Sequence, residues 1–98
     1  MTSFSTIINS GKLVLVDFFT EWCGPCKLMA PVLHELKTKV GDTATILKID
    51  VDKSPESASK FNIQGVPTLI LFKKGEIKWR HSGLVSAQAL QQVIGQYS

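Results

Sequence analysis

A run of seven residues, Leu13–Phe19, constrains the fold of this chain more than any other segment. Every side chain in the run is apolar except that of Asp17. Parallel strands that are covered on both faces have such unbroken apolar runs, whereas half-exposed strands alternate apolar and polar residues. The run therefore predicts a parallel strand that is buried on both faces of a sheet.

The segments around this run alternate between helical and extended patterns. Their order predicts an α/β fold: one mixed sheet with helices on both faces, and a functional site at the carboxyl end of the first strand. Ser54 and Ser86 have the hydroxyl side chains typical of helix N-caps, and Pro55 suits a first helical position. The further strands expected are residues 45–51, 68–72 and 77–81, and the apolar residues of 45–51 predict a second buried strand. The helices begin near Phe4, Cys23, Ser54 and Ser86.

The only two cysteines, Cys23 and Cys26, follow the apolar run and lie three positions apart. Residues at this spacing share one face of a helix, so their sulfurs can bond with little backbone movement. Cys23 lies at the helix N-terminus, where free N–H groups and the helix dipole stabilise a thiolate. We expect Cys23 to be the exposed nucleophile and Cys26 the shielded resolving thiol. Gly24 permits close approach of a substrate backbone, and Pro25 stiffens the turn.

Zinc binding is the alternative use of the two cysteines. Zinc normally takes four ligands, and the other soft candidates are His34 and His81. Their spacing fits no common zinc pattern, so we expect both histidines on solvated faces and no metal site.

Asp17 and Lys48 are charged residues within segments that are otherwise apolar. Burial disfavours a charged carboxyl group, so we expect the pKa of Asp17 to be raised. Asp17 would lie behind the helix that carries Cys26, where it can accept a proton. It can also cap a neighbouring turn. If the two side chains face the same side of the sheet, they form an ion pair; otherwise Lys48 extends to the edge.

Two further segments predict the walls of a substrate groove. Pro67 lies at the start of a strand. The peptide bond before a proline is trans by default, but it can also be cis. A cis bond leaves the Val66 backbone free to pair with an extended substrate. Gly83, after the last strand, indicates by itself only a loop.

Composition bounds the remaining possibilities. The chain has 98 residues and a net charge of +3. We expect residues 1–98 to form a single domain, because no repeat or linker divides them. Like charges are scattered, which does not indicate a nucleic-acid surface. Leu13–Phe19 is too short to span a bilayer, and no signal peptide is visible, so we expect a cytoplasmic protein without membrane contact.

The chain resembles the thioredoxin family from about Leu13 to its C-terminus, in motifs that are highly specific in order and spacing. The motifs are Val16-Asp17-Phe18, Trp22-Cys23-Gly24-Pro25-Cys26-Lys27, Ala30-Pro31, Lys48, Val66-Pro67-Thr68, Phe72-Lys73-Lys74-Gly75 and Gly83.

This resemblance implies a role for each matching residue. It implies Cys23 as nucleophile, Cys26 as resolving thiol, and Asp17 as buried base with Lys48 beside it. It also implies a cis Pro67. The substrate platform that it implies comprises Trp22, Val66 and Gly83.

The resemblance implies a protein disulfide reductase, an electron carrier in cell redox homeostasis, with no cofactor of its own. Its partners would be disulfide-containing proteins and a flavin-containing thioredoxin reductase that restores the dithiol. Gly24-Pro25 is the reductase variant of the motif and argues against the alternative, a thiol oxidase or isomerase. A second alternative is a binding subunit in which redox chemistry is incidental.

Four features depart from the family pattern. Phe19 replaces a common tryptophan, Ser82 replaces an apolar residue, and Trp79 has no family role that we can assign. The fourth is a short N-terminus: helical spacing around Phe4–Ile8 leaves no room for the usual first strand. We therefore expect four strands, with residues 45–51 as an apolar, unprotected edge. The N-terminal segment covers this edge in a monomer, or the edge pairs with a second chain.

Overall fold

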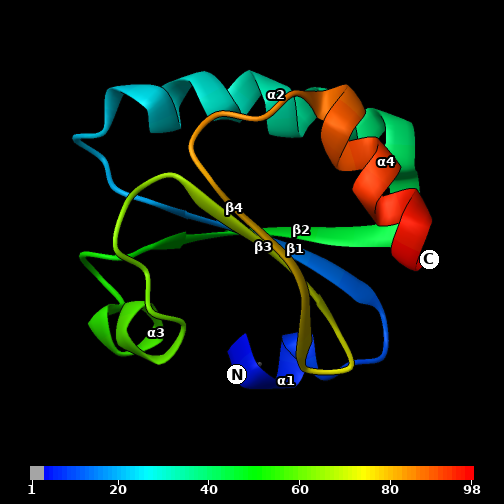
Figure 1. Cartoon of the computed structure of the whole chain (residues 1–98), viewed down its shortest axis with the longest axis horizontal. Helices are drawn as coiled ribbons and strands as arrows, with labels where there is room; N and C mark the ends of the chain where they lie inside the picture. The colour runs from blue at the N-terminus through cyan, green and yellow to red at the C-terminus, as the bar shows by residue number, and fades with distance from the viewer. Residues whose placement is uncertain (1–3) are drawn as a thin grey trace.

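The computed structural model describes residues 4–98 of the chain. In this part of the chain, four strands form one mixed sheet in the order β2-β1-β3-β4 (Figure 1). β1 runs parallel to β2 and antiparallel to β3, and β3 and β4 form an antiparallel hairpin. The strands are β1 (Leu13–Phe19), β2 (Ala44–Asp50), β3 (Thr68–Lys73) and β4 (Glu76–Ser82).

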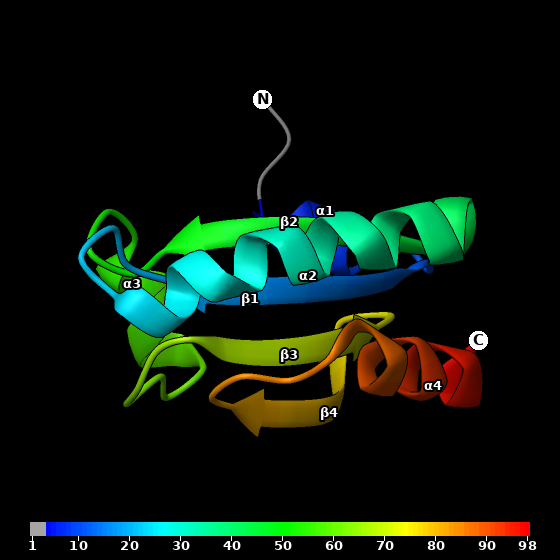
Figure 2. The same cartoon turned by 90° about the horizontal axis from the view of Figure 1, so that it is seen from above.

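Helices cover both faces of this sheet. Two of them, α2 and α4, lie on one face, while α1 and α3 lie on the other (Figures 1 and 2). A 3-10 turn, η1 (Gly41–Thr43), joins α2 to β2. The helices are α1 (Phe4–Ile8), α2 (Gly24–Val40), α3 (Pro55–Lys60) and α4 (Ala87–Tyr97). The mixed α/β architecture expected from the sequence is confirmed.

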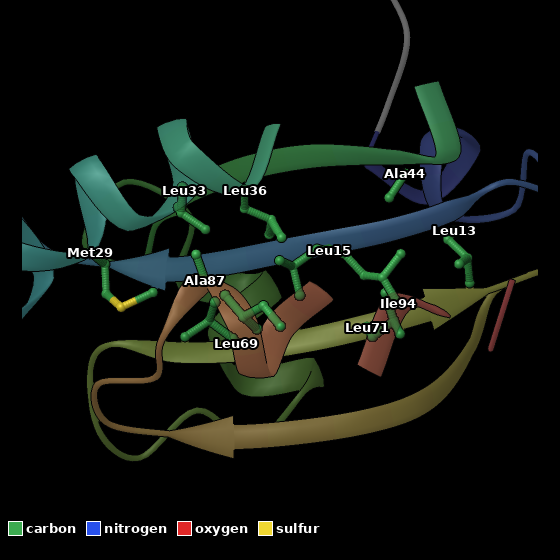
Figure 3. Close-up of a cluster of buried hydrophobic side chains, with 11 residues drawn as sticks. Leu13, Leu15, Met29, Leu33, Leu36, Ala44, Leu69, Leu71, Ala87 and Ile94 are labelled. Carbon is green, nitrogen blue, oxygen red and sulfur yellow. The ribbon is translucent and has the colours of Figure 1, made fainter. Parts of the chain in front are cut away.

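The sheet has a hydrophobic core on each face, and β1 supplies side chains to both of them. This confirms that β1 is buried on both faces. Leu13 and Leu15 pack among residues of α2 and α4, such as Met29 and Ile94 (Figure 3). The alternate residues of β1 pack in a second core with residues of α1 and with Phe61 and Ile63, which follow α3. Because successive side chains of a strand point to opposite faces, each layer is attached to the same central strand.

The core on the α1 and α3 side is built around phenylalanines. Phe4 of α1 makes edge-to-face contacts with three other rings, at centroid distances of 5.6 to 6.4 Å. Such pairs stabilise a core by about 0.5–1.5 kcal/mol beyond the area that they bury. The rings that Phe4 contacts are Phe18, Phe61 and Phe72.

The second strand differs from the sequence-based expectation. It spans Ala44–Asp50 instead of residues 45–51, and most of its residues are half-buried instead of buried. The reason is that β2 lies at the edge of the sheet: among the described residues it pairs with β1 on one side and with no strand on the other. The prediction of an edge strand in a four-stranded sheet is confirmed. The expected cover from the N-terminal segment involves Met1–Ser3, which lie outside the described residues.

The two serine caps have different outcomes. The Ser86 hydroxyl accepts a hydrogen bond from the Ala89 amide at 3.1 Å, so it caps α4 as expected. Ser54 occupies the N-cap position of α3, but its side chain makes no capping hydrogen bond. Its ψ of 62° is not the extended backbone that a capping serine normally adopts, which explains why this expectation is wrong.

The aromatic contacts of Phe4 predict that α1 contributes to stability. Replacing Phe4 by Ala should lower the free energy of unfolding by about 2 kcal/mol, since a half-buried ring loses part of the 3–5 kcal/mol typical of a buried one. Urea unfolding would measure the loss. Ser5→Ala, an exposed neighbour in the same helix, is the matched control and should change stability by less than about 0.5 kcal/mol. Equal effects of the two substitutions would contradict this packing.

Candidate functional site

The two cysteines lie at the carboxyl end of β1, where α2 begins. Cys23 is the N-cap of α2, and its sulfur is bonded to that of Cys26 in a disulfide. The Cys26 amide donates a hydrogen bond to Cys23 Sγ at 3.1 Å. Pro25, in the first turn of α2, has no N–H to donate. A thiolate at Cys23 would therefore receive a backbone N–H and the positive end of the helix dipole.

The expected difference in exposure between the two cysteines is wrong for this disulfide-bonded state. Cys23 is 5% exposed and Cys26 is 4% exposed. Both cysteines are therefore buried in the disulfide-bonded protein. Access differs in another way: Cys23 borders a cavity at the surface, and Cys26 does not.

This cavity has a volume of about 470 Å³ and lies between three loops. The loops follow β1, follow β2 and precede β3, so they meet at one end of the sheet. It includes four of the six residues expected to bind substrate; Pro67 and Gly83 lie outside its lining. The lining consists of Thr20, Trp22, Cys23, Gly24, Pro25, Val51, Asp52, Ile63, Gln64, Gly65 and Val66.

Trp22 forms an exposed wall of the cavity. Its side chain is 73% exposed, although tryptophan is usually among the more buried residues. The indole Nε1 donates a hydrogen bond to Asp52 Oδ2 at 2.9 Å, which holds the ring in one orientation. An exposed, oriented aromatic ring provides apolar contact area for a partner at a small entropic cost.

The turn before β3 forms the opposite wall. The Val66–Pro67 peptide bond is cis, as the resemblance implies. The Val66 carbonyl oxygen lies 3.7 Å from Cys23 Sγ. Gly83, with a φ of +99° that favours glycine, donates its N–H to the Pro67 carbonyl oxygen at 2.8 Å. Gly83 thus supports this wall from behind.

Asp17 is fully buried in β1, on the face that α2 covers. Neither carboxyl oxygen has a hydrogen-bond partner among the described residues. Burial raises the pKa of Asp17 from its ordinary value of 3.8 to about 6, and the nearby Lys48 charge offsets only part of this rise. The expected increase in pKa is confirmed. The alternative, in which Asp17 caps a turn, is wrong because a capping carboxylate would accept an N–H hydrogen bond.

Lys48 is the direct neighbour of Asp17 in the parallel pairing of β1 and β2. The two residues form no ion pair within the part of the chain that the structure describes. The Lys48 ammonium instead lies 4.6 Å from the centre of the Phe19 ring. Lys48 is exposed and Asp17 is buried, so a direct ion pair would require a second desolvated charge. The Lys48 charge still lowers the pKa of Asp17, although the two side chains form no ion pair.

The histidines show no sign of a metal site. His34 is exposed on α2, and His81 is half-buried and stacks on Trp79 at 5.8 Å. Across residues 4–98, no cluster of three or more histidine, cysteine or acidic side chains is placed to hold a metal ion. The helices in this part of the chain are also too short or too polar to cross a membrane.

Several residues that line the cavity were not predicted from the sequence. Asp52 had a usable signal, because it follows β2, and the carboxyl ends of neighbouring parallel strands meet at one edge of a sheet. Ile63 and Gln64 had none, since they lie in an irregular loop before β3. Thr20 follows β1 directly and is 2% exposed, and its hydroxyl makes no hydrogen bond within the described residues.

Comparison with known proteins shows which family this chain resembles in sequence. The family model described as thioredoxin matches residues 1–96. Thioredoxin of Bacillus subtilis is 43% identical and covers 97% of this chain and 90% of its own length. Thioredoxin of Chlamydia muridarum is 47% identical, with coverages of 97% and 91%.

Solved structures of similar proteins have the same fold. A mutant thioredoxin from Halobacterium salinarum superposes with a TM-score of 0.88 at 37% identity, over 99% of this chain and 84% of its own. Mitochondrial thioredoxin 3 from Saccharomyces cerevisiae, in oxidised form, has a TM-score of 0.84 at 33% identity. Its coverages are 95% and 86%.

The raised pKa of Asp17 predicts how stability depends on pH in the disulfide-bonded protein. The folded state keeps the proton up to about pH 6, whereas the unfolded state loses it near 3.8. Unfolding between these values therefore releases a proton, and stability falls as pH rises through this range. The total loss should be roughly 3 kcal/mol by pH 7.

Urea unfolding of Asp17→Asn from pH 4 to pH 7 tests this prediction. The variant should be more stable than the parent at pH 7 and should show a flatter pH dependence. Asp42→Asn, a change to an exposed carboxylate of η1, should leave the pH dependence as it is in the parent. Parallel pH profiles for the parent and Asp17→Asn would exclude Asp17 as the origin of the effect.

Proposed function

The chain belongs to the thioredoxin family, and on this premise we propose how its residues divide the work of dithiol–disulfide exchange. It is a thiol–disulfide oxidoreductase that reduces disulfides in other proteins. The observation that carries the assignment of residues is the Cys23–Cys26 disulfide at the N-terminus of α2, beside a cavity that Cys23 borders and Cys26 does not.

Cys23 makes the first attack. In the reduced protein, its thiolate attacks one sulfur of a substrate disulfide and forms a mixed disulfide. The other substrate sulfur leaves as a thiolate and takes a proton from solvent. Support for Cys23 comes from its place at the helix end, from the Cys26 N–H directed at its sulfur, and from its contact with the cavity.

Cys26 completes the transfer. Its thiol loses a proton and attacks Cys23 Sγ, which forms the Cys23–Cys26 bond and expels the second substrate sulfur as a thiolate. The substrate gains two electrons and two protons, and the protein is oxidised to the state that the structure describes. Asp17 is the proposed proton acceptor, because a carboxyl group with a pKa of about 6 can both take and release a proton near neutral pH. Lys48 assists by limiting the rise of this pKa.

The cavity would hold the substrate backbone next to Cys23. Trp22 offers an oriented apolar ring, and Gly24 and Pro25 leave the approach to the sulfur open. The Val66 carbonyl, close to Cys23 Sγ, can accept a hydrogen bond from an extended substrate segment. Pro67 and Gly83 act from outside the cavity by fixing the turn that carries Val66.

The cellular setting is also part of the proposal. We expect a flavin-containing thioredoxin reductase to restore the dithiol. We further expect residues 1–98 to act as one domain and a monomer, without nucleic-acid or membrane partners. A cytoplasmic location fits a protein whose cysteines form one reversible pair. Turnover with a purified thioredoxin reductase and NADPH would test the donor, and gel filtration coupled to light scattering would test the monomer.

Trapping experiments test the order of attack. Cys26→Ser should accumulate mixed disulfides with protein substrates through Cys23, because nothing can resolve them. Cys23→Ser should accumulate none and should reduce no substrate. Non-reducing electrophoresis followed by mass spectrometry would identify the cysteine in each adduct.

Alkylation by iodoacetamide provides an independent check on the reduced protein. Cys23 should react at neutral pH much faster than Cys26, since only its sulfur is stabilised as a thiolate and borders the cavity. Equal rates for the two thiols, or adducts that form through Cys26 in Cys23→Ser, would refute the assignment.

A further inference from the structure

Two hydroxyl groups meet where β3 and β4 pair, close to the turn that carries Val66. Thr68 and Ser82 are direct neighbours in the antiparallel pairing, and their oxygens lie 3.1 Å apart. Thr68 is fully buried, whereas Ser82 is exposed. A second contact joins Thr68 Oγ1 to the Gly65 carbonyl oxygen at 2.6 Å. The three groups form a chain from the protein surface to the turn before β3.

The direction of this chain follows from the chemistry of its members. A carbonyl oxygen can only accept a hydrogen bond, so the single hydroxyl proton of Thr68 goes to Gly65. The bond between Ser82 and Thr68 must then be donated by Ser82. An apolar residue at position 82 could not donate this proton, and the buried Thr68 hydroxyl would keep only one of its two bonds.

The chain ends at the groove proposed above. Gly65 and Val66 both line the cavity, and the Val66 carbonyl oxygen lies 3.7 Å from Cys23 Sγ. The residue after Ser82 makes a second link to the same turn, because the Gly83 amide donates a hydrogen bond to the Pro67 carbonyl oxygen. The end of β4 is therefore tied to this turn by one backbone bond and by one chain of hydroxyls.

We infer that Ser82 is a positioning residue for the substrate groove: through Thr68 it holds the Gly65–Val66 backbone in place beside Cys23. This inference rests on the proposed role of the groove in binding substrate. Ser82 is not among the residues that line the cavity, so it acts on binding through Thr68 and not on the chemistry of the thiols.

Substitutions that remove or keep the hydroxyl test this role. Ser82→Val lacks the donor, and Ser82→Thr retains it. Reduction of a peptide disulfide by each fully reduced variant would be followed in a stopped-flow fluorimeter over a range of peptide concentrations. With Ser82→Val, the half-saturating concentration should rise about 3- to 10-fold, the effect of one lost hydrogen bond, while the limiting rate stays within about twofold. Ser82→Thr should behave like the parent.

Two further measurements separate positioning from general structural effects. Amide hydrogen exchange at Gly83, whose N–H donates to the Pro67 carbonyl, should be faster in Ser82→Val and unchanged in Ser82→Thr. The pH profile of Cys23 alkylation should be the same in all variants. Ile77→Val, at the far end of the same strand, is the matched control and should leave binding and exchange unchanged.

The outcomes distinguish this inference from the proposed function. If the parent protein does not reduce the peptide, the proposed function fails. If the parent does reduce the peptide, two results would refute the positioning role. In the first, Ser82→Val has the same half-saturating concentration as the parent; in the second, Ser82→Val and Ser82→Thr raise it equally. A fall in limiting rate without a change in half-saturation would also refute it. Should Ser82→Val fold poorly, Ser82→Ala removes the same donor, and the same outcomes apply.

Discussion

The burial of β1 between two layers is the constraint on which the rest of this structure depends. Its side chains enter both cores, so they share one core with α2 and α4 and the other with α1 and with Phe61 and Ile63, which follow α3. The carboxyl end of that strand is thereby held rigidly between the layers. Cys23 lies only four residues after the end of β1, so the packing that holds β1 also holds Cys23 in position.

The same burial creates the unusual electrostatics of the site. Asp17 belongs to the strand that must be buried, and its carboxyl group lies without hydrogen-bond partners among the described residues. A desolvated acid opposes folding when it is charged, so its retention costs stability at neutral pH. In the mechanism proposed above, proton transfer near pH 6 would offset this cost. Stability and the proposed proton transfer would then depend on the same buried group.

The parts of the site that follow from local pattern were predictable. The apolar run predicted the burial of β1, the spacing of Cys23 and Cys26 predicted a bond between them, and Ser86 predicted the start of α4. Expectations about exposure were less successful. The half-buried state of β2 depends on its place at the sheet edge, and Cys23 is buried next to the Val66 carbonyl from a distant loop. Neither is a property of one segment.

By itself, the sequence determined the order of the elements and the site at the end of β1, because each depends on residues that are near one another in the chain. It also predicted the direction of the shift in the pKa of Asp17, because the apolar residues around Asp17 predict that the strand is buried. Only the tertiary structure decided that Lys48 lies over Phe19 and not against Asp17, that Asp52 orients Trp22, and that Ser82 reaches Gly65 through Thr68. These contacts join residues from separate strands and loops. Their geometry depends on strand register and loop path, which are selected by the packing of the whole chain and leave no periodic signal in the sequence.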